Sequence, residues 1–137
     1  MGDSCILAGL TLAEKLLNQW YTDKLQPTGL TPTGYRTCRV LIREGGMQPS
    51  RLAEILDRSR PSMTALVERL ERDGFVRRLP VPGNRRSLEV VMTETGISRA
   101  EEARDILNRA DEELIALGGM SPGLEEDLNR LTRVLTD

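Results

Sequence analysis

The residues of this chain with the clearest capacity for chemistry are arginines concentrated in its middle. Residues 48–91 contain nine arginines and six acidic residues, a net charge of +3, whereas the rest of the chain carries −5. Arginine presents a planar fork of donors that suits phosphate and guanine, so this basic segment favours nucleic-acid binding. A solvated helix face has a similar composition, so the charge pattern alone leaves both interpretations open.

Other chemistry has little support in the sequence. Histidine is absent, and no nucleophile–base pair, phosphate loop or metal-ligand spacing is present. We therefore predict no enzyme activity, cofactor or metal, and we interpret the acidic runs at 111–113 and 125–127 as solvated helix faces. No apolar run is long enough to span a membrane, and the two distant cysteines suit a reducing cytoplasm, where we expect the protein to act.

The two cysteines differ in their expected surroundings. Cys38 falls in an apolar helical series and is expected to be a small buried side chain. Cys5 stands near the start of the first expected helix, where the helix N-terminus makes a thiol more acidic. Cys5 is therefore the candidate redox-active residue, and a terminal thiol without function is the alternative.

Apolar periodicity, with Gly and Pro at element ends, predicts the elements that must position the arginines. We expect helices over residues 6–25, 32–44, 49–56, 60–73 and 94–117, and a last helix starting at Ser121-Pro122. Strand-like runs at 75–79 and 88–92 flank the turn-rich, basic segment 80–86, which predicts a β-hairpin. The third helix has an apolar side of Leu52, Ala53, Ile55 and Leu56, and the fourth a core stripe of Met63, Leu66, Val67 and Leu70.

The third and fourth helices, joined by the short turn at 57–59, have the size of a helix-turn-helix. In such a motif the second helix enters the major groove. The candidate DNA-binding residues lie on its outward face, near its start and on the hairpin: Arg60, Pro61, Ser62, Thr64, Ala65, Arg69, Arg72, Arg77, Asn84, Arg85 and Arg86.

Residues 30–96 resemble the DNA-binding core of the MarR family of winged-helix regulators. The matching stretches are Leu-Thr-Pro-Thr at 30–33, Ser-Arg-Leu-Ala-Glu at 50–54, the run from Ser62 to Arg78, Asn-Arg-Arg at 84–86 and Met-Thr-Glu-Thr-Gly at 92–96. The resemblance implies a mainly α fold with a small β-hairpin wing. It places dimerisation helices at 1–29 and 94–137 around a winged helix-turn-helix core at 30–93.

The same resemblance implies function. It predicts a homodimer on a pseudo-palindromic operator of double-stranded DNA, acting as a repressor that a small aromatic or lipophilic ligand releases. Arg86 stands at the position of the wing arginine that enters the minor groove. Trp20 and Tyr21 lie next to the place where the family keeps a ligand pocket, and plain packing residues are the alternative.

The chain departs from the family pattern at three places. Asn84 replaces the usual Asp that braces the wing arginine, Leu79 and Val81 stand where charged residues are frequent, and Ala65 is small. These departures bear on affinity and sequence choice. Two other functions stay open: a thiol-based stress sensor using Cys5, and a winged-helix module that binds protein instead of DNA.

Overall fold

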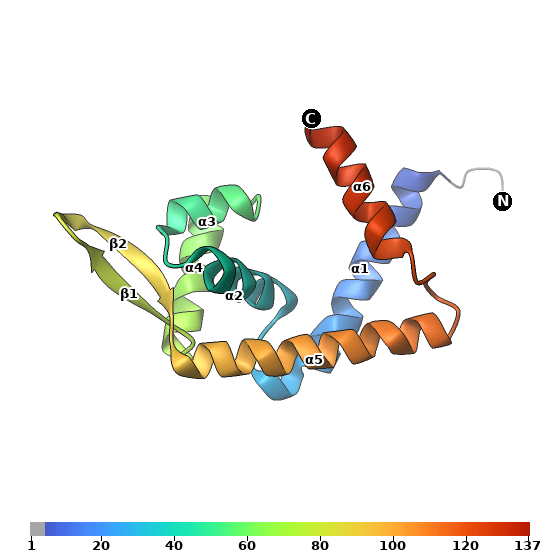
Figure 1. The fold of residues 1–137 in the computed structure, drawn as a ribbon, viewed down its shortest axis with the longest axis horizontal. Coiled ribbons are helices and arrows are strands. Elements are labelled where there is room, and N and C mark those ends of the chain that lie inside the picture. Colours follow the sequence, from blue (N-terminus) through green and yellow to red (C-terminus); the bar gives the residue numbers. More distant parts are fainter. Residues whose placement is uncertain (1–4) are drawn as a thin grey trace.

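The computed structural model describes residues 5–137, apart from the side chain of Arg85. Six α-helices, a short 3-10 helix and a two-stranded hairpin follow one another along the described chain (Figure 1). Their bounds are α1 Ile6–Leu25, η1 Gln26–Thr28, α2 Pro32–Glu44, α3 Pro49–Ile55, α4 Arg60–Arg72, β1 Val76–Val81, β2 Asn84–Met92, α5 Glu94–Ala116 and α6 Leu124–Thr136. The predicted mainly α fold with a β-hairpin wing is thus confirmed. None of the described helices combines the length and the apolar character needed to cross a membrane.

Local capping explains where three of the helices begin. The hydroxyls of Thr31, Ser59 and Thr93 accept the backbone N–H groups three residues later, at 3.0, 3.2 and 2.9 Å. These bonds satisfy N–H groups that the first turn leaves without helical partners. The starts of α2, α4 and α5 were therefore predictable from the sequence.

The helix α5 forms the long axis of the molecule. In Figure 1 it runs from the base of the hairpin, past α2, to the turn that leads into α6. The segment α2–α4 and the hairpin gather at one end, whereas α6 and the first half of α1 lie at the other. Contacts of α5 with both α1 and α2 join the two ends.

The core lies between α2, α3, α4, α5 and the base of the hairpin. Leu52, Met63, Val67 and Val90 are fully buried, and Leu66 packs against them while partly exposed. The prediction that Ile55 belongs to this core is wrong, because its side chain is 38% exposed. Leu52, Ala53 and Leu56 define the inward arc of α3, and Ile55 lies about 100° around the helix from the centre of that arc.

The wing is longer than predicted. Residues 80–86 were expected to form one basic loop, but only Pro82 and Gly83 connect the strands, with Gly83 at a φ of 80°. The ladder runs from Val76 opposite Met92 to Pro80 opposite Leu88 and then jumps to Val81 opposite Asn84. Pro80 is tolerated there because β1 is the free edge of the ribbon, whereas Met47 bridges β2 at Val90. Residues 85–87 thus lie outside the regular ladder.

The last helix also starts later than predicted. It begins at Leu124, not at Ser121, whose carbonyl accepts the N–H of Leu124 at 3.2 Å in a preceding turn. Gly118, at a φ of 77°, ends α5 in the left-handed conformation that favours glycine.

Candidate DNA-binding surface

The helix-turn-helix is built by packing α4 against α3 through one apolar side. Met63, Val67 and Leu70 are buried along α4, which leaves the opposite side of the helix facing outward. In the turn, Asp57 has a φ of 51°, and the N–H of Arg58 donates to the carbonyl of Ala53 at 2.9 Å. The turn therefore places the start of α4 next to the end of α3.

Most of the predicted residues of α4 lie on its outward side. The exposed ones are Arg60, Pro61, Thr64, Ala65, Arg69 and Arg72. Among the described residues, the ion pairs do not include Arg60, Arg69 or Arg72. Three guanidinium groups on one helix are thus available to an anionic partner.

Ser62 differs from its neighbours on α4. It is half-buried, and its hydroxyl accepts a hydrogen bond from Nε of Arg58 at 3.2 Å. Its backbone N–H is the one that Ser59 caps. Ser62 therefore holds the first turn of α4 together in addition to standing near the predicted DNA-binding face.

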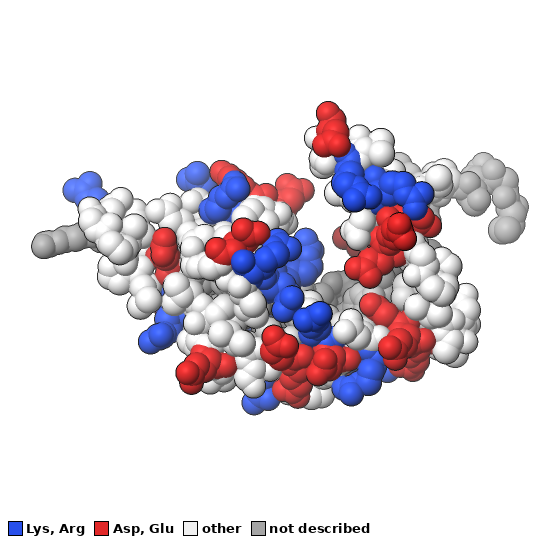
Figure 2. Space-filling model, in the orientation of Figure 1, with Lys and Arg blue, Asp and Glu red and all other residues white. Residues whose placement is uncertain are grey.

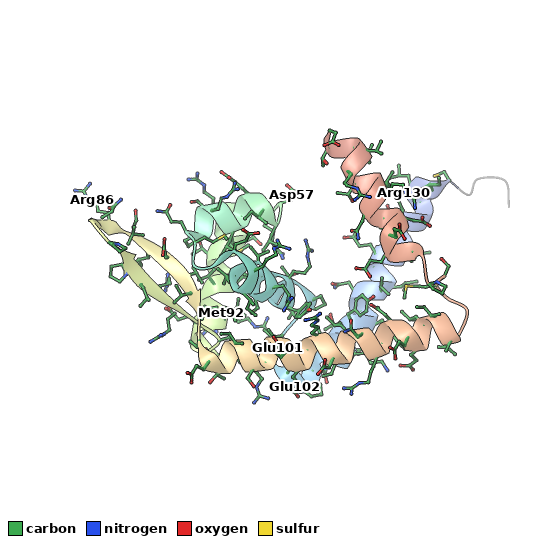
Figure 3. All side chains as sticks on the ribbon, viewed as in Figure 1. Asp57, Arg86, Met92, Glu101, Glu102 and Arg130 are labelled. Carbon is green, nitrogen blue, oxygen red and sulfur yellow. The ribbon has the colours of Figure 1, made fainter. Side chains whose placement is uncertain are left out.

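The wing carries exposed arginines. Arg77 is exposed on β1, and Arg86 points away from the protein at the outer end of the hairpin (Figure 3). The side-chain oxygen of Asn84 accepts the backbone N–H of Arg86 at 3.2 Å. This uncharged bond braces the chain at the position where the family usually has an aspartate. The predicted contact through Arg85 lies outside the described side chains.

The structure adds Arg78, which sequence reasoning left out. Its Nη2 and Nε donate to Oε1 of Glu71 at 2.8 and 3.2 Å, joining β1 to α4. The hydrogen bond from Arg78 lowers the pKa of Glu71 below its usual value. The sequence held a signal for this role, because side chains alternate along a strand and Arg77 and Arg78 must therefore lie on opposite faces of the ribbon. Arg78 thus positions the wing on α4.

Charge is distributed unevenly over the molecule. Figure 2 shows basic side chains over the α2–α4 region and at the outer end of the wing and acidic side chains along α5 and near the start of α6, with side chains of the opposite sign among both the α2–α4 and the α5–α6 groups. Arg36 of α2 lies outside the basic segment of the sequence, but it is exposed and lines the same hollow as Arg58 and Ser62. Tertiary structure therefore extends the basic surface beyond residues 48–91.

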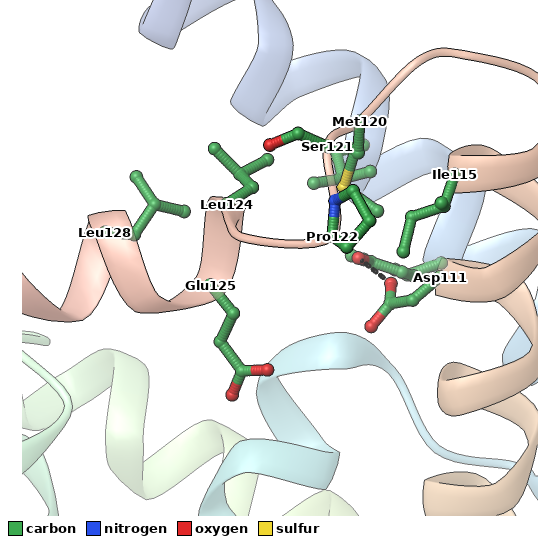
Figure 4. Close-up of a pocket in the computed structure, with 10 residues that line it drawn as sticks. Asp111, Ile115, Met120, Ser121, Pro122, Leu124, Glu125 and Leu128 are labelled. Atoms are coloured by element: carbon green, nitrogen blue, oxygen red, sulfur yellow. Dashed lines mark hydrogen bonds between the residues drawn. The ribbon is translucent and has the colours of Figure 1, made fainter.

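The predicted ligand-binding residues lie at the other end, where α1 meets α5 and α6. Tyr21 lines a cavity of about 230 Å³ with Asp111, Met120 and Leu124 among its other walls (Figure 4). Trp20 lines a neighbouring cavity of about 330 Å³ that shares Met120 and Leu124. Both aromatic side chains are half-buried, so they pack between helices and also border open space.

Polar contacts hold these aromatic residues in place. The Tyr21 hydroxyl donates to a carboxylate oxygen of Asp111, and burial followed by this bond raises the pKa of Tyr21 above its usual value. The ammonium group of Lys24 lies 4.4 Å from the centre of the Trp20 ring and 2.9 Å from the carboxylate of Glu113. Nε1 of Trp20 is buried without a hydrogen-bond partner among the described residues.

The cysteines lie in opposite environments. Cys38 is fully buried, as predicted, and burial raises the pKa of its thiol to about 12. Such a thiol is inert near neutral pH. Cys5 is exposed, and its sulfur accepts the backbone N–H of Ala8 at 3.3 Å, capping α1. Within residues 5–137, no group of three or more His, Cys, Asp or Glu side chains has the placement of a metal site.

Comparison with known proteins agrees with this geometry. The model of the MarR family matches residues 30–88. The uncharacterised HTH-type transcriptional regulator YcgE of Bacillus subtilis is 30% identical over 119 residues, which cover 77% of this chain and 77% of YcgE. The HTH-type regulator PecS of Dickeya dadantii is 32% identical over 75 residues, and that match spans only 45% of PecS and 49% of this chain.

The fold has a close counterpart among solved structures. The transcriptional repressor CouR, bound to a 23-mer DNA duplex, superposes with a TM-score of 0.85 over 97% of this chain and 93% of CouR, at 21% identity. That likeness concerns the fold. Because the YcgE match extends well beyond the winged helix and the family model covers the helix-turn-helix and most of the wing, this chain belongs to the MarR family of DNA-binding transcriptional regulators, which are not enzymes.

Proposed function

We propose that the protein represses transcription by binding a pseudo-palindromic operator as a homodimer, and that a small ligand releases it. The observation that carries this proposal is the exposed face of α4, whose arginines have no ion-pair partners among the described residues, followed by Arg86 at the end of the wing. In CouR, the same fold is a repressor bound to duplex DNA.

The proposed DNA contacts fall into base contacts near the start of α4 and phosphate contacts further along the chain. Arg60, Thr64 and Ala65 contact base edges in the major groove, where the small Ala65 suits a thymine methyl group. Arg69, Arg72 and Arg77 lie further along and bind phosphates, which fix the register of the protein on the duplex. Arg86 enters the neighbouring minor groove, where a narrow groove concentrates negative potential. Pro61, Ser62, Asn84 and Arg85 complete the proposed surface.

Dimerisation accounts for apolar side chains that a single copy leaves in solvent. Leu7 on α1 and Leu135 on α6 are 74% and 75% exposed, and further leucines of both helices are exposed around them. An exposed apolar surface of this kind marks an interaction site, and two-fold dimers are its commonest use. We therefore assign residues 1–29 and 94–137 to dimerisation and residues 30–93 to DNA binding. The two copies of α4 then enter successive major grooves roughly 34 Å apart.

Release requires a ligand that binds the two arrangements of the dimer with different affinity. The cavities beside Trp20 and Tyr21 suit a small aromatic or lipophilic compound, because leucine and methionine side chains form much of their walls. They lie between the helices that would link the two copies. A ligand there changes the spacing of the two DNA-binding ends at a cost of a few kcal/mol, which is typical of allosteric coupling.

Oxidation of Cys5 is a second route to release. Its exposure and its place at the N-cap of α1 favour this route over any through Cys38. Replacing Cys5 with Ser would abolish release by peroxide if the thiol is the sensor and would leave release unchanged otherwise. Electrophoretic mobility shifts with and without peroxide distinguish the two outcomes.

The proposal is tested by fluorescence anisotropy on a duplex taken from upstream of the protein's own gene, with a scrambled duplex beside it. We expect preference for the native sequence and a steep loss of affinity with salt, since each neutralised phosphate contributes about −0.9 to the slope. Arg86→Ala should weaken binding. Absence of binding to either duplex at low salt would count against the DNA-binding face itself and favour a protein-interaction role.

A further inference from the structure

We propose that the wing is an apolar wedge in which Leu79 and Leu88 pack against deoxyribose groups of the minor groove beside Arg86. This inference rests on the proposed DNA-binding function and assigns a role to side chains other than the wing arginine. It predicts that part of the binding free energy from the wing is independent of salt.

The outer half of the hairpin exposes apolar side chains. Leu79 and Leu88 are 41% and 40% exposed, Pro80 and Pro82 are exposed, and Val81 is partly exposed. The inner half differs, since Val76 and Val90 are almost completely buried. The core therefore covers the base of the ribbon and ends before these residues.

The register of the ladder places these side chains on both faces of the ribbon. Pro80 lies opposite Leu88, and residues directly opposite in an antiparallel pair project from the same face. Leu79 precedes Pro80, so it projects from the other face, opposite Glu89. The hairpin thus presents apolar groups on either side as it narrows toward Pro82 and Gly83.

A partner for this end of the wing must meet a leucine on each face, with Glu89 beside Leu79 on one of them, and an arginine at the outer end. The minor groove has that character: it is about 6 Å wide, and its sides are lined by sugar C–H groups. Proteins that enter it commonly use leucine and proline as well as arginine. The wing continues directly from the α4 face through β1, so one duplex can meet both surfaces.

Lysine or arginine at positions 79 and 88 would instead reach phosphates and make binding more sensitive to salt. The uncharged Asn84, which braces Arg86 through its backbone N–H, adds no charge either. The outer half of this wing therefore combines the arginine at its end with leucine and proline side chains, and Glu89 is the acidic residue beside them, opposite Leu79.

The test measures dissociation constants of the full-length protein at several salt concentrations, on a duplex that the wild-type protein selects from a random-sequence library. Leu79→Ala and Leu88→Ala should each weaken binding about threefold to tenfold with no change in the salt slope, because they remove apolar contact only. Arg86→Ala should weaken binding and make the slope shallower by about 1.8, because each copy of the dimer loses one cation and each contributes about 0.9. Leu88→Lys should make the slope steeper by a similar amount.

Ile55→Ala serves as the matched control. Ile55 is 38% exposed, close to the value of the two leucines, but it lies on α3, outside the proposed contact and outside the segments assigned to dimerisation. We expect it to bind DNA as the wild type does. Thermal unfolding by circular dichroism checks that all variants fold.

Three results would overturn the inference. Unchanged binding by both leucine variants would show that neither side chain touches DNA, while leaving the proposed function intact. A loss of binding matched by a loss of thermal stability, or a change of oligomeric state, would assign the leucines to packing or to contact with a second copy. Failure of the wild type to select any sequence would overturn the proposed function together with the wing contact.

Discussion

Gly96 shows how a single residue limits the fold. It lies in the first turn of α5, where the helix passes the backbone that leads into β1. A Cβ at this position would collide with the carbonyl oxygen of Phe75 and would lie 2.8 Å from Cε of Met92. Backbone cannot move aside as the end of a flexible side chain can, so only glycine permits this close approach.

We expect Gly96→Ala to destabilise the protein by about 3 kcal/mol, because overpacking against backbone forces local rearrangement. Gly9→Ala is the control: the site on α1 has no heavy atom within 4 Å of an added Cβ. It should stabilise the helix by about 0.5 kcal/mol, since alanine loses less backbone entropy. Urea unfolding at one fixed protein concentration measures both. Equal stability of Gly96→Ala and wild type would contradict this prediction and would mean that the start of α5 can move away from the Phe75 backbone without cost.

At the scale of elements, α1 and α5 are joined by polar contacts as well as by packing. The Tyr21 hydroxyl bonds to Asp111, and Lys24 forms an ion pair with Glu113 two residues further along α5. The two side chains of this ion pair are 35% and 48% exposed, and solvent screening leaves such a pair little stabilising effect. The Tyr21 contact is partly buried and involves a charged acceptor, which makes it the stronger of the two.

The raised pKa of Tyr21 makes this contact sensitive to alkaline pH. Burial and the bond to Asp111 favour the protonated tyrosine in the folded state, so its contribution is fully present below pH 10 and is lost as pH rises above that. We expect wild-type stability to fall between about pH 10 and about pH 11 more steeply than that of Tyr21→Phe. Urea unfolding across this range measures the difference. Burial also raises the pKa of Tyr35, so the stability of the Tyr21→Phe variant still decreases somewhat with pH in this range. Identical slopes would contradict the assignment.

At the scale of the whole molecule, the two ends have different surfaces. Apart from Ile55 and the wing leucines, the winged-helix end buries its apolar residues within one chain, whereas α1 and α6 leave theirs exposed at the opposite end. A single copy therefore completes a core at one end only. This asymmetry is the physical reason for the proposed dimer, in which the arms of two chains cover one another.

We expect the double substitution of Leu131 and Leu135 by Asp to convert the dimer to a monomer, because it puts charge on the exposed apolar side of α6. Affinity for the operator should fall about 100-fold or more, since the two half-sites would no longer be bound together. Sedimentation velocity and anisotropy measure the two effects. Asn129→Asp adds a charge to the same helix at another exposed position and should leave both unchanged. A dimer that survives the double substitution would place the interface elsewhere.

The sequence by itself determined the order of the elements, the helix-turn-helix and the outward arginines of α4. These follow from local causes, namely helical periodicity and hydroxyl caps at Thr31, Ser59 and Thr93. Tertiary structure alone decided the length of the wing, the pairing of Arg78 with Glu71 and the placement of Tyr21 against Asp111. Each of these features depends on strand register or on the place where two elements meet. The residue spacing within one segment encodes neither the register nor the meeting place. The exposure of Ile55 has the same origin, because its neighbours across the core set which arc of α3 is buried.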